Sequence, residues 1–186
     1  MVDTPPVHSR LTVSEESALR LDGLSWSSGS LVWPHPAPPL LPERAEMVRD
    51  IVPGWAIVTA HTAAWIYTGM GRAEPWALCV PSKPAISPLQ RRQWRPRSIS
   101  LKPQDVVDLR GLKLTSVPRT VYDLLTWPGS DEVAACQLYL LATAAHLERA
   151  LAPGQFSPLT SSTCERARRR TLLAQQWWRD YPLVTR

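Results

Sequence analysis

The stretch that decides the fold is Leu112–Leu125, which has the sequence LKLTSVPRTVYDLL. Leu112 and Leu114 alternate with polar neighbours, which is the two-residue period of a half-buried strand. Apolar residues then recur at helical spacing, and a proline in the first turn of a helix costs no backbone hydrogen bond. We therefore predict a strand that runs directly into a helix over Val117–Thr126, with Ser116 as the capping residue.

Two opposite charges on this helix are spaced to form an ion pair. Arg119 and Asp123 are four residues apart, so their side chains share one face and lie close enough to pair. Because we interpret this stretch as structural, we expect the pair to be buried and to serve the fold.

The chain contains two further motifs, the pattern Thr115-Ser116-x-x-Arg119-Thr120-x-x-Asp123-Leu124 and the segment from His61 to Gly69, HTAAWIYTG. Both resemble motifs of the AbiEi-like antitoxin family of type IV toxin–antitoxin and abortive infection systems, which has relatives in actinobacteria. The resemblance extends over roughly residues 45 to 186. We expect both motifs to hold the fold together rather than to bind a ligand. Their residues with an expected structural role are His61, Ala64, Gly69, Ser116, Arg119 and Asp123.

Further elements are predicted on either side of the deciding stretch. A strand at Val106–Leu109 should pair with Leu112–Thr115 through a tight turn at Arg110–Gly111. The other predicted strands are Ala77–Val80 and Ser98–Leu101, and the other helices of this region are Ala60–Tyr67, Glu132–Leu151 (with Asp131 as its cap) and Ser162–Arg179. The result is an α+β fold, in which a small, mostly antiparallel sheet packs against helices on one side and a helical region ends the chain.

The N-terminal part is predicted to be a separate arm. The chain has 186 residues, enough for one domain, and its 19 prolines are about twice the average usage of roughly 5%. We assign residues 1–42 to a short, irregular, Pro-rich arm with one helix at Ser14–Leu21 and either a hairpin or a strand at Trp26–Trp33. Residues 43–186 form the α+β domain. Relatives of the AbiEi type usually carry a winged helix-turn-helix here, so the resemblance implies a reduced or lost DNA-binding module.

Arginines cluster in two places. The net charge is +5, and only three of the 21 basic residues are lysines. Clustered basic residues are typical of surfaces that bind nucleic acid or an acidic protein, although a solvated face is the simpler interpretation. The candidate surface residues are Arg91, Arg92, Arg95, Arg97, Arg166, Arg169 and Arg170.

The last helix leaves a choice between core and interface. Leu172, Leu173, Gln176 and Trp177 predict an apolar stripe, with the arginines of this helix on its other faces. A stripe of this kind is typical of core packing, yet Trp and Arg are also enriched in protein interfaces.

The sequence lacks the residue patterns of three kinds of catalytic site. Vsr-like nucleases, to which some relatives are fused, need an acidic residue two positions before a lysine. Lys83, Lys102 and Lys113 are preceded at that spacing by residues 81, 100 and 111, none of which is acidic. Asp105 and Asp108 are interpreted as surface charges on a strand. We find neither a Gly-rich phosphate loop nor a nucleophile elbow, and so predict that the protein is not an enzyme.

The remaining composition points away from metals, cofactors and membranes. Three cysteines and four histidines are too far apart to suggest a disulfide framework or a metal site, and we expect neither a metal nor another cofactor. No apolar run has the roughly 20 residues of a membrane span, and the N-terminus lacks the features of a signal peptide. These features predict a cytoplasmic protein that does not contact the membrane.

The resemblance implies a non-enzymatic antitoxin. Such a protein neutralises a nucleotidyltransferase-like toxin and often represses its own operon. Weak, non-specific DNA binding is expected from this chain. The alternative hypothesis is a stand-alone α+β interaction module that has lost its DNA-binding domain and binds another protein.

Overall fold

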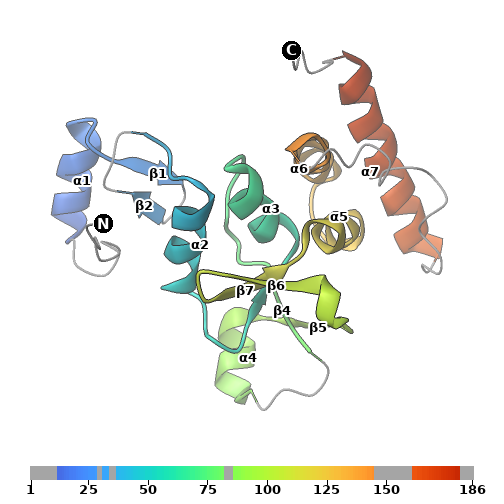
Figure 1. The fold of residues 1–186 in the computed structure, drawn as a ribbon, viewed down its shortest axis with the longest axis horizontal. Helices are drawn as coiled ribbons and strands as arrows, with labels where there is room; N and C mark the ends of the chain where they lie inside the picture. Colours follow the sequence, from blue (N-terminus) through green and yellow to red (C-terminus); the bar gives the residue numbers. More distant parts are fainter. Residues whose placement is uncertain (1–11, 29–30, 34–36, 82–85, 145–160, 181–186) are drawn as a thin grey trace.

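The computed structural model describes residues 12–28, 31–33, 37–81, 86–144 and 161–180 (Figure 1). Residues 34–36 of the predicted Pro-rich arm and the predicted end of the helix at Leu151 lie outside these residues. In chain order the elements are α1 (Val13–Leu21), β1 (Trp26–Ser28), β2 (Leu31–Trp33), α2 (Leu41–Arg49), β3 (Ile57–Val58), α3 (Ala60–Thr68), β4 (Leu78–Val80), α4 (Pro88–Trp94), β5 (Arg97–Ser98), the 3-10 turn η2 (Pro103–Asp105), β6 (Val106–Leu109), β7 (Leu112–Thr115), α5 (Val117–Thr126), α6 (Asp131–Ala144) and α7 (Ser161–Asp180).

The strands of the described residues form two sheets and confirm the α+β class. β1 and β2 make an antiparallel hairpin, and the main sheet has the order β5-β4-β3-β7-β6. Three of the five pairings are antiparallel, whereas β3 runs parallel to β7 and β4 runs parallel to β5. The chain passes through α4 between the parallel neighbours β4 and β5, whereas α3 connects β3 to its antiparallel neighbour β4.

The predicted β6–β7 hairpin is confirmed. Val106 pairs with Thr115 and Leu109 with Leu112. Arg110 and Gly111 both have positive φ, 56° and 80°, as the twist of a two-residue hairpin turn requires. The Gly111 amide also donates to the side chain of Asp108 at 2.9 Å, which holds the turn closed.

Helix α5 has the predicted bounds, but it is not capped in the predicted way. Ser116 occupies the N-cap position, yet its side chain makes no capping hydrogen bond. The start of the helix is instead held by buried hydroxyl groups, because Thr115 and Thr120 are hydrogen bonded at 2.8 Å. The strand-to-helix junction is therefore secured by the residues on each side of Ser116.

The first cluster of arginines is divided between a helix and a strand, because Arg91 and Arg92 lie on α4, Arg95 directly follows it and Arg97 lies on β5. Ser87 caps α4 through the Gln90 amide, and Pro88 stands in the first turn, where its missing N–H is harmless. The helix ends at Arg95, which has a positive φ of 45°. Strand β5 is correspondingly shorter than the predicted Ser98–Leu101 and begins at Arg97.

Figure 1 shows α3, α5, α6 and α7 on one side of the main sheet, with α4 away from them on the other side. The core has two clusters. The first surrounds Trp65 and Leu114 and contains Leu31, so the predicted N-terminal arm contributes a fully buried side chain to it. The second lies between α3, α5, α6 and α7 and contains Leu125 and Leu138.

Gly69 ends α3 for two physical reasons. Its φ is 72°, the left-handed conformation that a helix C-terminus favours for glycine. A Cβ atom at this position would also lie 3.0 Å from the guanidinium of Arg44, which donates to the carbonyls of Ile66 and Tyr67. The glycine thus lets an arginine of α2 cap the end of α3.

Helix α6 begins one residue earlier than predicted, and its cap is Ser130 instead of Asp131. The Ser130 side chain accepts from the Val133 amide at 3.3 Å. Asp131 is therefore free to pair elsewhere. In the described part of the chain, no helix combines the length and the apolar character that crossing a bilayer demands.

Candidate functional site

The Arg119–Asp123 pair on α5 forms as the spacing predicted. Arg119 Nε donates to Asp123 Oδ1 at 2.9 Å, and the Asp123 side chain is only 4% exposed. The second carboxylate oxygen accepts a hydrogen bond of 2.5 Å from the hydroxyl of Thr59, at the start of α3. Burial raises the pKa of the Asp123 carboxyl, although the bond from Thr59 and the charge of Arg119 act in the opposite direction. The pair therefore links two helices at one edge of the core.

Arg119 also reaches the opposite wall of a groove. Its Nη1 donates to the carbonyl of Ser100 at 3.2 Å and lies 3.4 Å from Asp105 Oδ2. Among the described residues, its second terminal nitrogen, Nη2, has no hydrogen-bond acceptor. The guanidinium is thus held in place on one side and keeps free donor capacity on the other.

The interpretation of Asp105 as a surface charge on a strand is wrong. Asp105 belongs to η2, where its carboxylate accepts from the Lys102 amide at 2.8 Å and faces Arg119. The sequence signal is a proline followed two residues later by an acid, which suits a short capped turn. Asp108, in contrast, is exposed on β6 as predicted.

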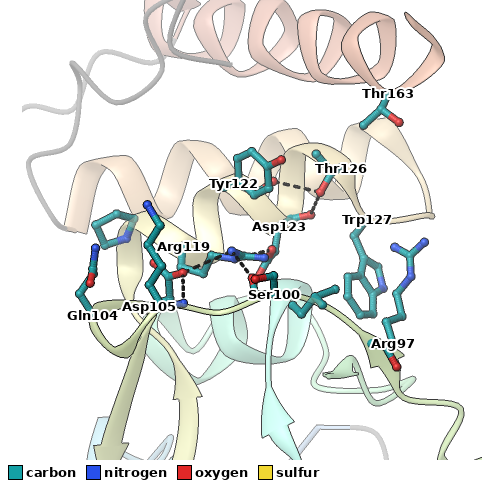
Figure 2. Close-up of a pocket in the computed structure, with 14 residues that line it drawn as sticks. Arg97, Ser100, Gln104, Asp105, Arg119, Tyr122, Asp123, Thr126, Trp127 and Thr163 are labelled. Carbon is teal, nitrogen blue, oxygen red and sulfur yellow. Dashed lines mark hydrogen bonds and ion pairs between the residues drawn. The ribbon is translucent and has the colours of Figure 1, made fainter. Parts of the chain in front are cut away.

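These side chains line a groove of about 770 Å³ between α5 and the segment from Arg97 to Asp105. Figure 2 shows that it extends from Gln104 and Asp105 at one end to Arg97 and Trp127 at the other. The Arg97 guanidinium lies 4.8 Å from the centroid of the Trp127 ring. Sequence reasoning missed this contact because the two residues are far apart in the chain.

Charge is unevenly distributed along the groove. Arg119 lies between the carboxylates of Asp123 and Asp105, so its charge is largely balanced. Arg97 and Lys102 are exposed and form no ion pair with a described residue. The accessible cations of the groove are therefore Arg97 and Lys102.

Arg170 does not belong to the basic surface to which it was assigned. Its side chain is 1% exposed and pairs with Asp131 through an Nε–Oδ1 bond of 2.7 Å. It also donates to the backbone carbonyls of Leu124, Trp127 and Gly129. These carbonyls lie at and beyond the end of α5, where helical partners are lacking, so Arg170 acts as a buried cap between helices.

The other predicted basic residues lie apart from one another. Arg91 and Arg92 are exposed on α4 and Arg95 is exposed directly after it, whereas Arg97 faces the groove from β5. On α7, Arg166 is half-buried and donates to the Thr126 carbonyl. Arg169 is exposed and pairs with Asp131 at 2.6 Å. The two predicted clusters thus contain both surface and packing residues.

The remaining residues of the second motif pack within the domain. Ala64 is fully buried in the second core cluster. His61 is hydrogen bonded through Nε2 to the Pro75 carbonyl, and burial lowers its pKa despite this bond. Its own carbonyl accepts from the Gln137 side chain at 3.2 Å. These contacts join α3 to the loop before β4 and to α6.

The cysteines are free thiols in the structure. Cys79 is buried in β4, and desolvation raises its pKa to about 12, so it is a poor nucleophile. Cys164 is exposed on α7. Across the described residues, no three or more His, Cys, Asp or Glu side chains are grouped as a metal site would need. The groove beside α5 is consequently the most structured candidate site.

Comparisons of the chain with protein-family models, with curated proteins and with solved structures found no match.

Proposed function

We propose that this chain is a non-enzymatic, antitoxin-like protein that acts in the cytoplasm and neutralises a nucleotidyltransferase-like toxin by binding it. The observation that carries the proposal is the division of α7 into a packed face and an exposed arginine face. The two sequence motifs that resemble AbiEi-like antitoxins support the nature of the partner.

The inner face of α7 is part of the core. Its buried residues follow the spacing of a single helical face: Ala167, Arg170, Thr171 and Ala174. Leu173 also packs against the second core cluster, and the Trp177 ring contacts the Tyr139 ring of α6 edge-on, so this face fixes the helix against its neighbours.

The outer face of α7 is well suited to an acidic partner. Arg168 and Arg179 are exposed, and Leu172 between them is 56% exposed. An exposed leucine flanked by arginines combines apolar contact with charge, and arginine is enriched in protein interfaces. One helix thereby serves both of the roles that the sequence left open.

A test of the proposal compares two double variants of the full chain. Arg168→Glu with Arg179→Glu reverses the charge of the outer face, whereas Arg20→Glu with Arg72→Glu changes the net charge equally at exposed sites elsewhere. The assays are growth rescue and a pull-down with the nucleotidyltransferase-like protein encoded beside this gene. We expect only the α7 variant to lose both, with unchanged unfolding midpoints.

The outcomes separate the two candidate functions. Equal loss or equal retention of binding in the two variants would contradict the role of the α7 face. If the adjacent genes encode no nucleotidyltransferase-like protein, the alternative of a stand-alone interaction module is favoured.

A weaker second function is non-specific binding of DNA through α4. Arg91 and Arg92 are exposed on this short helix, and Arg95 is exposed directly after it. Contacts to phosphates release counterions, so binding should weaken steeply with salt. Replacing the three arginines by alanine should flatten the salt slope by up to about three units. Sequence-specific retardation of the chain's own promoter would instead favour autoregulation of transcription.

A further inference from the structure

The groove beside α5 contains an unpaired strand edge. β5 is the last strand of the main sheet, and among the described residues it pairs on one side only, with β4. Cys79 lies opposite Arg97 and Val80 opposite Ser98, and the Ile99 amide donates to the Val80 carbonyl at 3.1 Å. In a parallel ladder, this register directs the amide and the carbonyl of Ser98 away from β4.

One outward-facing group of this edge already has a partner. The Ser100 carbonyl, two residues along the same edge, accepts a hydrogen bond from Arg119 on α5. Arg119 therefore defines one end of the edge, and the backbone groups of Ser98 remain available within the lining of the groove. The groove is elongated in the direction of the chain from Arg97 to Asp105 (Figure 2).

The charges around this edge favour an acidic occupant. Arg97 and Lys102 lie along the same wall, are exposed and have no described acidic partner. The nearby carboxylates of Asp105 and Asp123 are both engaged by Arg119. Acidic side chains on an added strand would therefore be able to form ion pairs with Arg97 and Lys102.

We infer that the groove binds an extended, acidic segment of a partner protein, which adds a strand to β5 and pairs with the outward-facing backbone of Ser98. Adding a strand to a sheet edge is a common mode of peptide recognition, in which main-chain hydrogen bonds give affinity and side chains give specificity. Four residues from Arg97 to Ser100 span roughly 13 Å in a strand, which accommodates a short segment only. The inference concerns a site separate from the outer face of α7 and does not depend on the antitoxin role.

The test uses the full chain, labelled with nitrogen-15, and a defined peptide. The probe is an acetylated and amidated hexapeptide of alternating valine and glutamate, and its control has lysine in place of glutamate. We expect the acidic peptide to shift the amide resonances of Ser98 and Ser100 at about 1 mM, within the millimolar range of weak binding. The lysine peptide should leave them unchanged.

Two variants separate strand addition from simple charge attraction. Ser98→Pro removes an amide that points away from β4, so it should preserve the fold, because proline is tolerated at sheet edges. The substitution should weaken binding of the acidic peptide roughly three- to tenfold, which corresponds to the loss of one hydrogen bond. The double variant Arg97→Ala with Lys102→Ala should weaken binding of the peptide by a similar factor. The double variant Arg110→Ala with Lys113→Ala removes the same amount of charge outside the groove and serves as the control.

Several results would overturn the inference. They are failure of the acidic peptide to shift Ser98 in a folded chain, equal binding by Ser98→Pro, and displacement of the peptide by inorganic phosphate at equal concentration. The last result would indicate a simple anion site. A single-stranded DNA oligonucleotide that binds the groove more tightly than the peptide would also overturn it, in favour of nucleic acid.

Discussion

One arginine–aspartate pair lies on helix α5 and a second, between α7 and α6, lies beyond the end of α5, and the two differ in which partner is more deeply buried. In the pair on α5, the aspartate is the more deeply buried partner, since Asp123 is 4% exposed and Arg119 17%. In the pair between α7 and α6, the arginine is the more deeply buried partner, since Arg170 is 1% exposed and Asp131 17%. In the first pair, the Arg119 guanidinium keeps free hydrogen-bond donors that face the groove. In the second pair, the Arg170 guanidinium donates to backbone carbonyls. The same two residue types thus make a site in one place and a structural cap in the other.

The largest expected effect is at the structural cap. Arg170→Ala leaves the carbonyls of Leu124, Trp127 and Gly129 without their donor and removes a buried partner of Asp131. Breaking such a network should lower the free energy of unfolding by about 3–5 kcal/mol, measured by urea denaturation. Arg168→Ala, on the exposed face of the same helix, should change it by less than about 0.5 kcal/mol. A similar loss of unfolding free energy in the two variants would contradict the division of α7 into a packed face and an exposed face.

Asp123→Ala tests the pair that faces the groove. It leaves the Thr59 hydroxyl without its acceptor, but Arg119 keeps the Ser100 carbonyl, Asp105 and partial access to solvent. We expect a loss of about 3 kcal/mol, at the lower end of the range for a broken buried pair. Asp123→Asn, which keeps an acceptor for Arg119, should lose less. A denaturation midpoint unchanged by Asp123→Ala would show that the pair does not stabilise the fold.

The contributions of Asp131 and Asp123 to the free energy of unfolding should change with pH in opposite directions. Although partial burial acts to raise it, the pKa of Asp131 is lowered overall by Arg170 and Arg169. Asp131 therefore stabilises the fold above its unfolded pKa of about 3.9, and this contribution is lost as the pH falls through the folded value. Burial raises the pKa of Asp123, so ionisation of this group lowers the free energy of unfolding as the pH rises through the same unfolded value.

Urea denaturation between about pH 3 and pH 7 checks these signs, since the unfolded pKa lies within that range. The difference in unfolding free energy between the wild type and Asp131→Asn should shrink as the pH falls. The wild type should instead gain relative to Asp123→Asn over the same interval. Parallel pH profiles for the two variants would contradict the difference between the two pairs.

The sequence predicted what depends on near neighbours in the chain. The period of Leu112–Leu125 predicted β7 and α5, and a spacing of four predicted the Arg119–Asp123 pair. The Arg170–Asp131 pair joins residues 39 positions apart, and no local pattern indicates it. The predicted apolar stripe of α7 is divided: Leu173 and Trp177 pack inward, whereas Leu172 and Gln176 are exposed. Small residues at positions 167, 171 and 174 let this helix approach its neighbours closely.

The groove illustrates the same limit. Its walls come from β5, η2 and α5, and its exposed cations could be located in the sequence but not assigned to one cavity. Arg97 was grouped with the arginines of α4 because they are close in sequence. The chain changes direction at Arg95, where φ is positive, and this turn separates Arg97 from them. Residues other than glycine and asparagine uncommonly adopt a left-handed backbone, so an arginine at position 95 does not predict such a turn.

The smallest effect is expected from the neighbour of the buried arginine. Arg169 and Arg170 contact the two oxygens of Asp131 at similar distances, 2.6 and 2.7 Å, so the two pairs differ mainly in burial. Arg169 is 63% exposed, and an exposed ion pair contributes only about 0.2–1 kcal/mol because water and salt screen it. Arg169→Ala should therefore lower the unfolding free energy by no more than this, and 1 M salt should remove most of the difference. If Arg169→Ala were as damaging as Arg170→Ala, the stability of the cap would come from the charge of Asp131 and not from the backbone carbonyls that Arg170 alone contacts.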